Sequence, residues 1–168
     1  MKKKDISWEK TNHEKYMKEA YKEGLKAYNK LETPVGAVIV FNGKIIARGH
    51  NTREQKQDPT QHAEIIAIKK AAKKLGSWRL IDCDLYVTLE PCPMCAGALI
   101  QSRIRNLYYG AKDPKAGAVG SVLDLLAIEK FNHRVNAYNG IMENECSEIL
   151  KNFFRELRKS KGKKGMSP

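Results

Sequence analysis

Long hydrophobic runs are missing from this chain of 168 residues. The longest is VGAVIVF at 35–41, which is far shorter than the roughly 20 apolar residues of a membrane-spanning helix. The N-terminal stretch MKKKDISWEK is basic, but Asp5, Glu9 and Lys10 interrupt the place where a secretion signal would need an apolar region. We therefore expect a cytoplasmic protein that makes no contact with a membrane.

Cysteine is also scarce, with four residues in the chain. Since no export signal is visible, we do not expect a disulfide framework, and closely spaced cysteines indicate metal binding or redox chemistry instead. The length suits one compact domain whose core is large enough to fold without covalent cross-links.

Acidic residues are few relative to basic ones. The 31 Lys and Arg less the 19 Asp and Glu give a formal charge of +12, with a sequence pI near 9.5. This balance favours an anionic partner, of which RNA and DNA are the commonest, although a basic protein that is merely soluble shows the same balance. Basic residues concentrate in RKSKGKKGMSP at 158–168, which has nothing to bury. We predict a single domain over 1–159 and a basic disordered tail over 160–168.

The periodicity of apolar residues alternates between helix and strand. Intervals of three and four residues predict a helix from about 8 to 29. Residues 34–49 have the pattern of two strands joined by Asn42 and Gly43, because both residues tolerate positive φ in a tight hairpin turn. Farther along, the pattern predicts strands at 84–90, at 106–112 and near 134–138, and helices at about 93–102, 121–128 and 142–159. With a right-handed parallel crossover, these elements form an α/β fold, a three-layer α/β/α sandwich around a mixed five-stranded sheet.

The stretch DPTQHAEIIAIKKAAKK at 58–74 has the spacing of an amphipathic helix. Asp58 can cap its start, Pro59 suits the first helical position, and Gln61 can reach back to the cap. His62 is then expected in the first turn of this helix.

Cys92 and Cys95 follow an apolar strand in the stretch LEPCPMCAG at 89–97. In an open α/β sheet, strand ends and helix N-termini share one crevice, so we expect these thiols to converge with His62. A structural zinc is normally closed by four protein ligands, whereas a catalytic zinc has three and keeps its fourth position for water. The three residues therefore predict one catalytic zinc per chain, which lowers the pKa of its bound water toward about 7.

Glu64 adjoins this ligand set in the sequence, and a carboxylate there can take a proton from the water and return it to the leaving nitrogen. However, residues two apart on a helix point to nearly opposite sides, at about 100° per residue. His62 and Glu64 can act together only if the helix meets the metal end-on.

Other interpretations of the same residues remain open. Cys92 and Cys95 also have the spacing of a redox dithiol. A structural zinc would need a fourth ligand, for which the chain offers Cys83, Cys146, His50 and His133. We expect the two additional cysteines to be ordinary buried side chains, since one adjoins a strand and the other an apolar helical stripe.

The combination of HAE at 62–64 with PCPMC at 91–95 resembles the H-x-E and P-C-x-x-C motifs of zinc-dependent nucleobase deaminases. The chain is most similar to the bacterial tRNA-specific adenosine deaminases. That resemblance spans nearly the whole sequence, through PVGAV (34–38), HNTRE (50–54), WRLIDCDLYVTLEPCPMCAGA (78–98), GAKDPKAGAVGS (110–121), FNHRV (131–135) and FFRELRK (153–159). Cytidine, guanine and riboflavin-pathway deaminases share the two zinc motifs, and the FNHR and FFR elements favour tRNA.

The resemblance implies a cytidine deaminase-like fold and hydrolysis of adenosine to inosine at the wobble position of a tRNA anticodon, that of an arginine tRNA, by a homodimer. It also implies that zinc is held by His62, Cys92 and Cys95 and that Glu64 transfers protons. The remaining roles it implies are a hydrogen bond from Asn51 to the flipped base, contacts of Asp113 and Asn132 with the nucleotide and its neighbours, and contacts of Phe154 and Arg155 with RNA.

Two other classes of function remain open. A deaminase of free bases or nucleosides, of the guanine or cytidine type, would share the zinc and Glu64 but need no basic tail. A zinc-stabilised RNA-binding module would keep the basic surface, but it would need neither Glu64 nor an open metal position.

Overall fold

The computed structural model describes residues 6–164 of the chain and the side chains of 12–163. A five-stranded sheet lies at its centre, with strands β1 (Gly36–Phe41), β2 (Lys44–His50), β3 (Cys83–Leu89), β4 (Asn106–Ala111) and β5 (Asn136–Asn139) in the order β2-β1-β3-β4-β5. β1 runs antiparallel to both of its neighbours, whereas β3, β4 and β5 are parallel. The predicted mixed sheet is confirmed.

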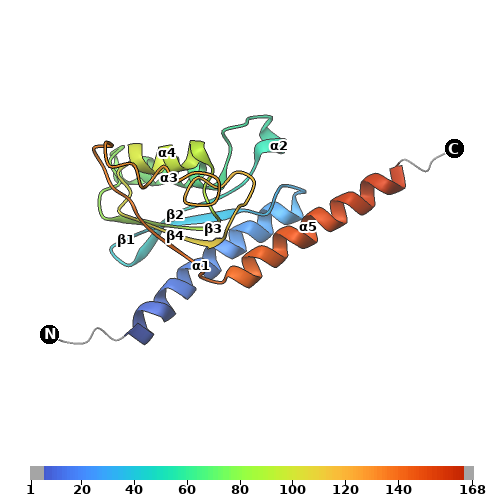
Figure 1. Cartoon of the computed structure of the whole chain (residues 1–168), viewed down its shortest axis with the longest axis horizontal. Coiled ribbons are helices and arrows are strands. Elements are labelled where there is room, and N and C mark those ends of the chain that lie inside the picture. The colour runs from blue at the N-terminus through green and yellow to red at the C-terminus, as the bar shows by residue number, and fades with distance from the viewer. Residues whose placement is uncertain (1–5, 165–168) are drawn as a thin grey trace.

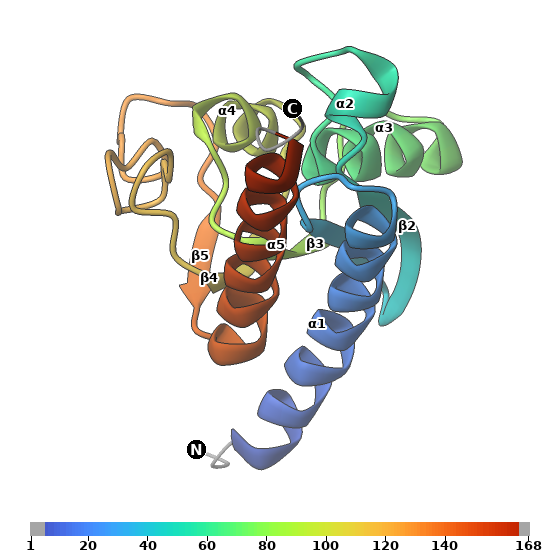
Figure 2. The ribbon, with the colours of Figure 1, turned by 90° about the vertical axis from the view of Figure 1, so that its right-hand side faces the viewer.

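Helices cover both faces of the sheet (Figure 1). α1 (Ile6–Asn29) and α5 (Glu143–Lys164) lie on one face, and α3 (Ala63–Leu75) and α4 (Pro93–Gln101) lie on the other (Figure 2). A single turn, α2 (Arg53–Lys56), precedes α3 and has no counterpart in the sequence prediction. The arrangement confirms the three-layer sandwich, and the end of α5 projects beyond the sheet. No helix in residues 6–164 has the length and apolar character needed to cross a bilayer.

Alternate side chains of the central strands pack into two separate hydrophobic cores, one on each face of the sheet, because successive side chains of a strand point to opposite faces. Ala37 and Ile39 of β1 pack with buried residues of α3 and α4. Val38 and Val40 of the same strand pack with Met17 and Ala20 of α1. Because both faces are covered, the strand is apolar throughout, which accounts for the run at 35–41.

Two glycines allow helices to lie close to the sheet. A Cβ added to Gly36 of β1 would lie 2.0 Å from the carbonyl oxygen of Ala20 in α1, and one added to Gly49 of β2 would lie 2.4 Å from that of Ala63 in α3. No side chain fits at either distance. Gly49 therefore sets how closely the start of α3 approaches the sheet.

The hairpin turn between β1 and β2 forms as predicted. Asn42 and Gly43 both have positive φ, of 49° and 74°. The side-chain hydroxyl of Tyr16 in α1 donates a hydrogen bond of 2.8 Å to the carbonyl of Gly43, so the turn is also tied to the helix below it.

The predicted start of the helix at Asp58 is wrong, because α3 begins at Ala63 with His62 as its N-cap. Asp58 instead closes a local turn, where its Oδ1 accepts hydrogen bonds from the backbone N–H and the hydroxyl of Thr60, at 2.8 and 2.7 Å. A short polar side chain that bonds its own neighbours competes with helix formation, and here the turn prevails.

The predicted helix at 121–128 is also absent from the described structure, which has turns there and an isolated bridge between Val119 and Asp124. The amide of Val122 donates back to the carbonyl of Gly117, and that of Leu125 to Ala118, both at 2.9 Å. These bonds fold the segment onto the preceding loop, and they replace the bonds of a helical ladder.

The last helix is longer than predicted. α5 continues through Lys164, so residues 160–164, expected in a disordered tail, are helical. Three of these five residues are Lys, which is a good helix former. The remainder of the expected tail, 165–168, lies outside the described residues.

Candidate active site

A cavity of about 190 Å³ lies where the parallel strands end and two helices begin. Leu89 borders it at the end of β3 and Cys92 at the start of α4. Asp113 borders it beyond the end of β4, and His62 and Glu64 border it at the start of α3. This is the crevice at which open α/β sheets bind their ligands. The structure thus brings together residues that lie up to 83 positions apart in the chain, from Thr33 to Ala116.

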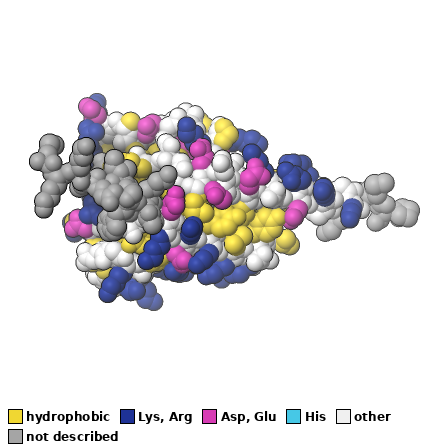
Figure 3. Space-filling model, turned by 90° about the horizontal axis from the view of Figure 1, so that it is seen from below, with side chains coloured by type: hydrophobic (Ala, Val, Ile, Leu, Met, Phe, Trp, Pro, Cys, Tyr) yellow, Lys and Arg dark blue, Asp and Glu magenta, His cyan; other side chains and the backbone are white. Residues whose placement is uncertain are grey.

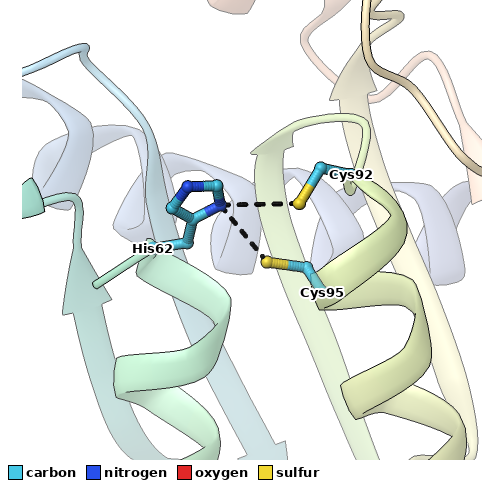
Figure 4. Close-up of side chains that lie close together, drawn as sticks. All are labelled: His62, Cys92 and Cys95. Atoms are coloured by element: carbon cyan, nitrogen blue, oxygen red, sulfur yellow. Dashed lines mark hydrogen bonds between the residues drawn. The ribbon is translucent and has the colours of Figure 1, made fainter. Parts of the chain in front are cut away.

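The three predicted metal ligands converge at one edge of this cavity (Figure 4). His62 Nδ1 lies 3.6 Å from Cys92 Sγ and 3.5 Å from Cys95 Sγ. His62 and Cys92 are the N-caps of α3 and α4, both with extended backbones, and Cys95 lies in the first turn of α4. Pro93 occupies the first helical position of α4, where its fixed φ suits the start of a helix.

These distances fit a tetrahedral zinc. With Zn–N near 2.0 to 2.1 Å and Zn–S near 2.3 Å, a nitrogen and a sulfur ligand of one ion lie about 3.5 to 3.6 Å apart. Both nitrogen-to-sulfur distances match that edge of the tetrahedron. A dithiol site alone does not require an imidazole nitrogen equidistant from its sulfurs, so the geometry favours metal binding over redox chemistry.

The described residues offer no fourth ligand to this group. Cys83 and Cys146 are fully buried in the two cores on opposite faces of the sheet, which confirms the expectation for both. His50 Nδ1 lies 3.1 Å from a carboxylate oxygen of Glu23. His133 Nε2 lies 2.7 Å from the carbonyl oxygen of Ile104. Three protein ligands leave one tetrahedral position open, as a catalytic zinc requires.

The electrostatics of the site favour thiolate at one cysteine. Hydrogen bonds with Cys95 and His62 lower the pKa of Cys92 to about 4, although burial opposes this shift. The hydrogen bond to Cys92, together with burial, raises the pKa of Cys95. The N-termini of α3 and α4 both face this charge, which their dipoles stabilise.

Glu64 is the second residue of α3 and is only 4% exposed. His62 is the N-cap of α3 and has an extended backbone, with φ −83° and ψ 153°. The rotation of about 100° per residue along a helix therefore does not apply between His62 and Glu64. Both side chains therefore border one cavity, and the helix meets the ligand group end-on. Burial raises the pKa of Glu64 to about 6, within the range suited to a group that exchanges protons near neutral pH.

Two of the predicted substrate-contacting residues also line the cavity, namely Asn51 and Asp113. Asn51 is 6% exposed, its Oδ1 accepts a hydrogen bond of 3.0 Å from the amide of Arg53, and its Nδ2 donates to the carbonyl of Thr33 at 3.3 Å. An amide has two donors and two acceptor lone pairs, so Asn51 keeps one of each for a ligand.

The other three predicted substrate-contacting residues, Asn132, Phe154 and Arg155, do not line the cavity. Asn132 is exposed in the loop before β5. On α5, Phe153 is buried against Tyr28, whereas Phe154 is 41% exposed and Arg155 bonds only to Asn152 among the described residues. Figure 3 shows Lys and Arg side chains along the projecting end of α5, beyond a group of hydrophobic side chains. The geometry is that of a separate basic surface.

Sequence reasoning missed two buried glutamates that hold the loops around the cavity. Glu32 is fully buried and accepts hydrogen bonds from the amides of Glu54 and Gln55 at the start of α2, at 3.2 and 2.7 Å. Glu90 is 2% exposed and accepts hydrogen bonds from three amides and one hydroxyl of the loop 113–121. Glu90 stands two residues before Cys92. An acidic residue this close in sequence to a predicted metal ligand was the signal that could have marked it as a candidate functional residue.

Known proteins that are similar to this chain in sequence are deaminases. The sequence model of the MafB19-like deaminases matches residues 11–158. The chain is 54% identical over 151 residues to the tRNA-specific adenosine deaminase of Bacillus subtilis, which covers 90% of this chain and 94% of that protein.

Two solved structures are similar over much of the fold. One comes from work on A-to-I editing by tRNA:A34 deaminases at the wobble position of transfer RNA. It is 47% identical with a TM-score of 0.78, over 80% of this chain and 98% of that one. The other is a guanine deaminase from Bacillus subtilis, which is 46% identical to this chain with a TM-score of 0.58. The match covers 60% of this chain and 64% of that one. By its sequence and its fold, this chain belongs to the MafB19-like deaminases and, among them, to the family of bacterial tRNA-specific adenosine deaminases.

Proposed function

We infer that this protein hydrolyses adenosine to inosine in tRNA, releasing ammonia. The observation that carries this inference is the buried carboxylate of Glu64 in one cavity with His62 and Cys92, in a chain of this family. A binding module would gain nothing from a buried carboxylate beside an open metal position, since its burial destabilises the charged form.

Zinc is the metal that best fits the donor set. One imidazole and two thiolates balance the charge of Zn²⁺, and borderline-soft zinc prefers these donors. We propose that His62, Cys92 and Cys95 hold one zinc per chain. When bound there, zinc supplies Lewis acidity that activates the attacking water.

Glu64 is proposed to move the protons of the reaction. Water adds to C6 of adenine, and the carboxylate accepts the proton that the water loses. The same carboxylate returns a proton to the exocyclic nitrogen, so that the C6–N bond breaks and ammonia leaves. Its position in the first turn of α3, next to the ligand His62, supports this role.

Asn51 and Asp113 are proposed to orient the nucleotide. Adenine presents acceptor nitrogens around the ring and a donor amine at C6, and the remaining donor and acceptor of Asn51 can pair with such an edge. An anticodon loop offers unpaired bases at a small unstacking cost, so a single-stranded loop suits this cavity better than a duplex.

The finer identity of the substrate is a proposal supported by sequence similarity. We propose the wobble adenosine of an arginine tRNA, held by a homodimer. Asn132, Phe154 and Arg155 are proposed to contact RNA outside the cavity, where an exposed aromatic ring beside basic side chains can stack on a base. Sedimentation of the purified protein would test the dimer.

The test of the function is inosine formation by the purified, zinc-loaded protein. Total tRNA should acquire inosine, and an anticodon stem-loop with adenosine at the wobble position should be converted while the same loop with cytidine is not. Asn51→Ala should lose most of this activity and keep its zinc. Preferential turnover of cytidine, or equal turnover of free adenosine, would refute the proposal.

Deamination of free guanine is the second candidate, because a guanine deaminase is 46% identical to this chain over the aligned part. Ammonia release from guanine and from the adenosine stem-loop, measured with the same preparation, separates the two. Faster turnover of guanine would decide for the second candidate.

A further inference from the structure

Glu90 is a buried carboxylate whose surroundings are unusual for a charged group. It follows the last residue of β3 and is 2% exposed. Its own amide donates to the carbonyl of Ala111 at the end of β4, at 2.8 Å. The main chain is thus fixed between two parallel strands, and the side chain points into the loop that follows β4.

All the acceptor capacity of this carboxylate is used by that loop. Oε2 accepts the amide of Asp113 at 2.9 Å and the hydroxyl of Ser121. Oε1 accepts the amides of Val119 and Ser121 at 3.0 and 3.1 Å. An ionised carboxylate offers about four lone-pair sites, so four donors from the two ends of one loop saturate it.

The loop is packed directly on this carboxylate. A Cβ added to Gly117 would lie 2.4 Å from the carboxyl carbon of Glu90, so only glycine allows the approach. Inside the loop, Asp113 Oδ1 accepts the amides of Lys115 and Ala116, at 3.0 and 3.2 Å. Asp113 and Ala116 both line the cavity, hence the wall they form is held at one end by Glu90.

We propose that Glu90 is a positioning residue for substrate, which sets the wall formed by 113–117 at a fixed distance from the metal ligands. Cys92 lies two residues after Glu90, in the short connection from β3 to α4, so one side chain ties the metal-binding segment to the opposite wall. This inference rests on the proposed function. The wall meets parts of the nucleotide that do not react, and such contacts stabilise the ground state and the transition state equally.

Glu90→Gln tests the proposal in the zinc-loaded protein. The glutamine side chain keeps one acceptor oxygen, but its NH₂ group replaces the other oxygen. Two donors of the loop then face another donor and lose their hydrogen bonds. We expect KM for the adenosine stem-loop to rise by about tenfold or more while kcat changes by less than about threefold, because uniform binding is what is lost. Elemental analysis should still find one zinc per chain.

A direct readout of the loop accompanies the kinetics. Hydrogen exchange at the amides of Asp113, Val119 and Ser121 should accelerate in Glu90→Gln. Ser121→Ala removes one of the four hydrogen bonds from an exposed position and should show a smaller rise in KM, which keeps the test valid if the first variant folds poorly. Glu23→Gln is the matched control, since Glu23 is 3% exposed but does not line the cavity, and it should leave KM unchanged.

The outcomes are distinct. An unchanged KM in both loop variants, with faster amide exchange, would show that the loop position does not matter for substrate. Loss of zinc from Glu90→Gln would show that the residue acts through Cys92 and would equally overturn the proposal. Wild-type protein that forms no inosine would contradict the proposed function, and the exchange data would still report whether Glu90 holds the loop.

Discussion

Replacing Glu64 by glutamine should separate the chemistry of the site from its assembly. Acid–base groups contribute about 10²- to 10⁴-fold to rate, and glutamine cannot accept the water's proton, so kcat should fall by about 10² or more. Glu64 is not part of the ligand group, and Glu64→Gln should therefore retain one zinc per chain and bind the stem-loop as the wild type does.

The same substitution should stabilise the metal-free protein. Burial raises the pKa of Glu64 from its ordinary value of 4.5 to about 6, so ionisation costs the folded state more than the unfolded state. At about 1.4 kcal/mol per pH unit, the difference of about 1.5 units corresponds to about 2 kcal/mol. For an acid with a raised folded pKa, this cost is absent when both states are protonated, develops as pH rises from about 4.5 to about 6, and is complete above that range.

Urea denaturation of the chelated protein at several pH values measures this effect. Glu64→Gln should exceed the wild type in free energy of unfolding at pH 8, and the two should approach each other near pH 4. If the variant is equally active, the proton-transfer role is wrong. If it is inactive but no more stable at pH 8, burial of the carboxylate does not carry the cost inferred from the structure.

Cys92→Ala should lose bound metal in elemental analysis, because one of only three ligands is removed. Hydrogen bonds to Lys26 and His50 hold the pKa of Glu23 below 4.5 against the opposing effect of burial. Its stabilising contribution is therefore complete above that pH and lost as pH falls through the folded pKa, and Glu23→Gln should flatten the acid loss of stability in urea titrations. Deleting 160–168 should reduce the salt dependence of tRNA binding by about 0.7 to 0.9 log units per lost phosphate contact, and an unaltered slope would mean that these residues touch no phosphate. Gly49→Ala should lower zinc affinity by displacing the start of α3, whereas Gly97→Ala, which meets nothing within 4 Å, should not.

The sheet and the ligand set were accessible from the sequence because both depend on short-range pattern. Alternation and apolar runs fix which residues are strands, and the C-x-x-C spacing brings two thiols to one ion whatever surrounds them. The start of α3 was not accessible in this way. Asp58 is a good cap and an equally good turn former, and the choice between them depends on where the chain must be to place His62 beside α4.

Glu90 shows why contacts made by one residue with a distant loop escape sequence analysis. In the stretch LEPC it follows an apolar strand and precedes a proline, which is also what an exposed residue at a strand end looks like. Its function becomes visible only when the amides of 113–121, more than 20 positions away, are seen to converge on its carboxylate. Nothing in the local pattern of either segment encodes that pairing.

The two N-caps explain how the metal site relates to the stability of the chain. An N-cap side chain normally accepts a hydrogen bond from the first turn, and losing that bond costs about 1 kcal/mol per helix. Neither His62 nor Cys92 makes such a bond, since the imidazole and the thiol turn toward each other across the gap between α3 and α4. The metal-free chain thus leaves two helix starts uncapped in order to keep its ligands together. Zinc ligation, with an affinity on the order of 10 kcal/mol in structural sites of similar donors, far exceeds that cost. It follows that the geometry of both helix starts is suited to the metal-bound protein and is a compromise without it.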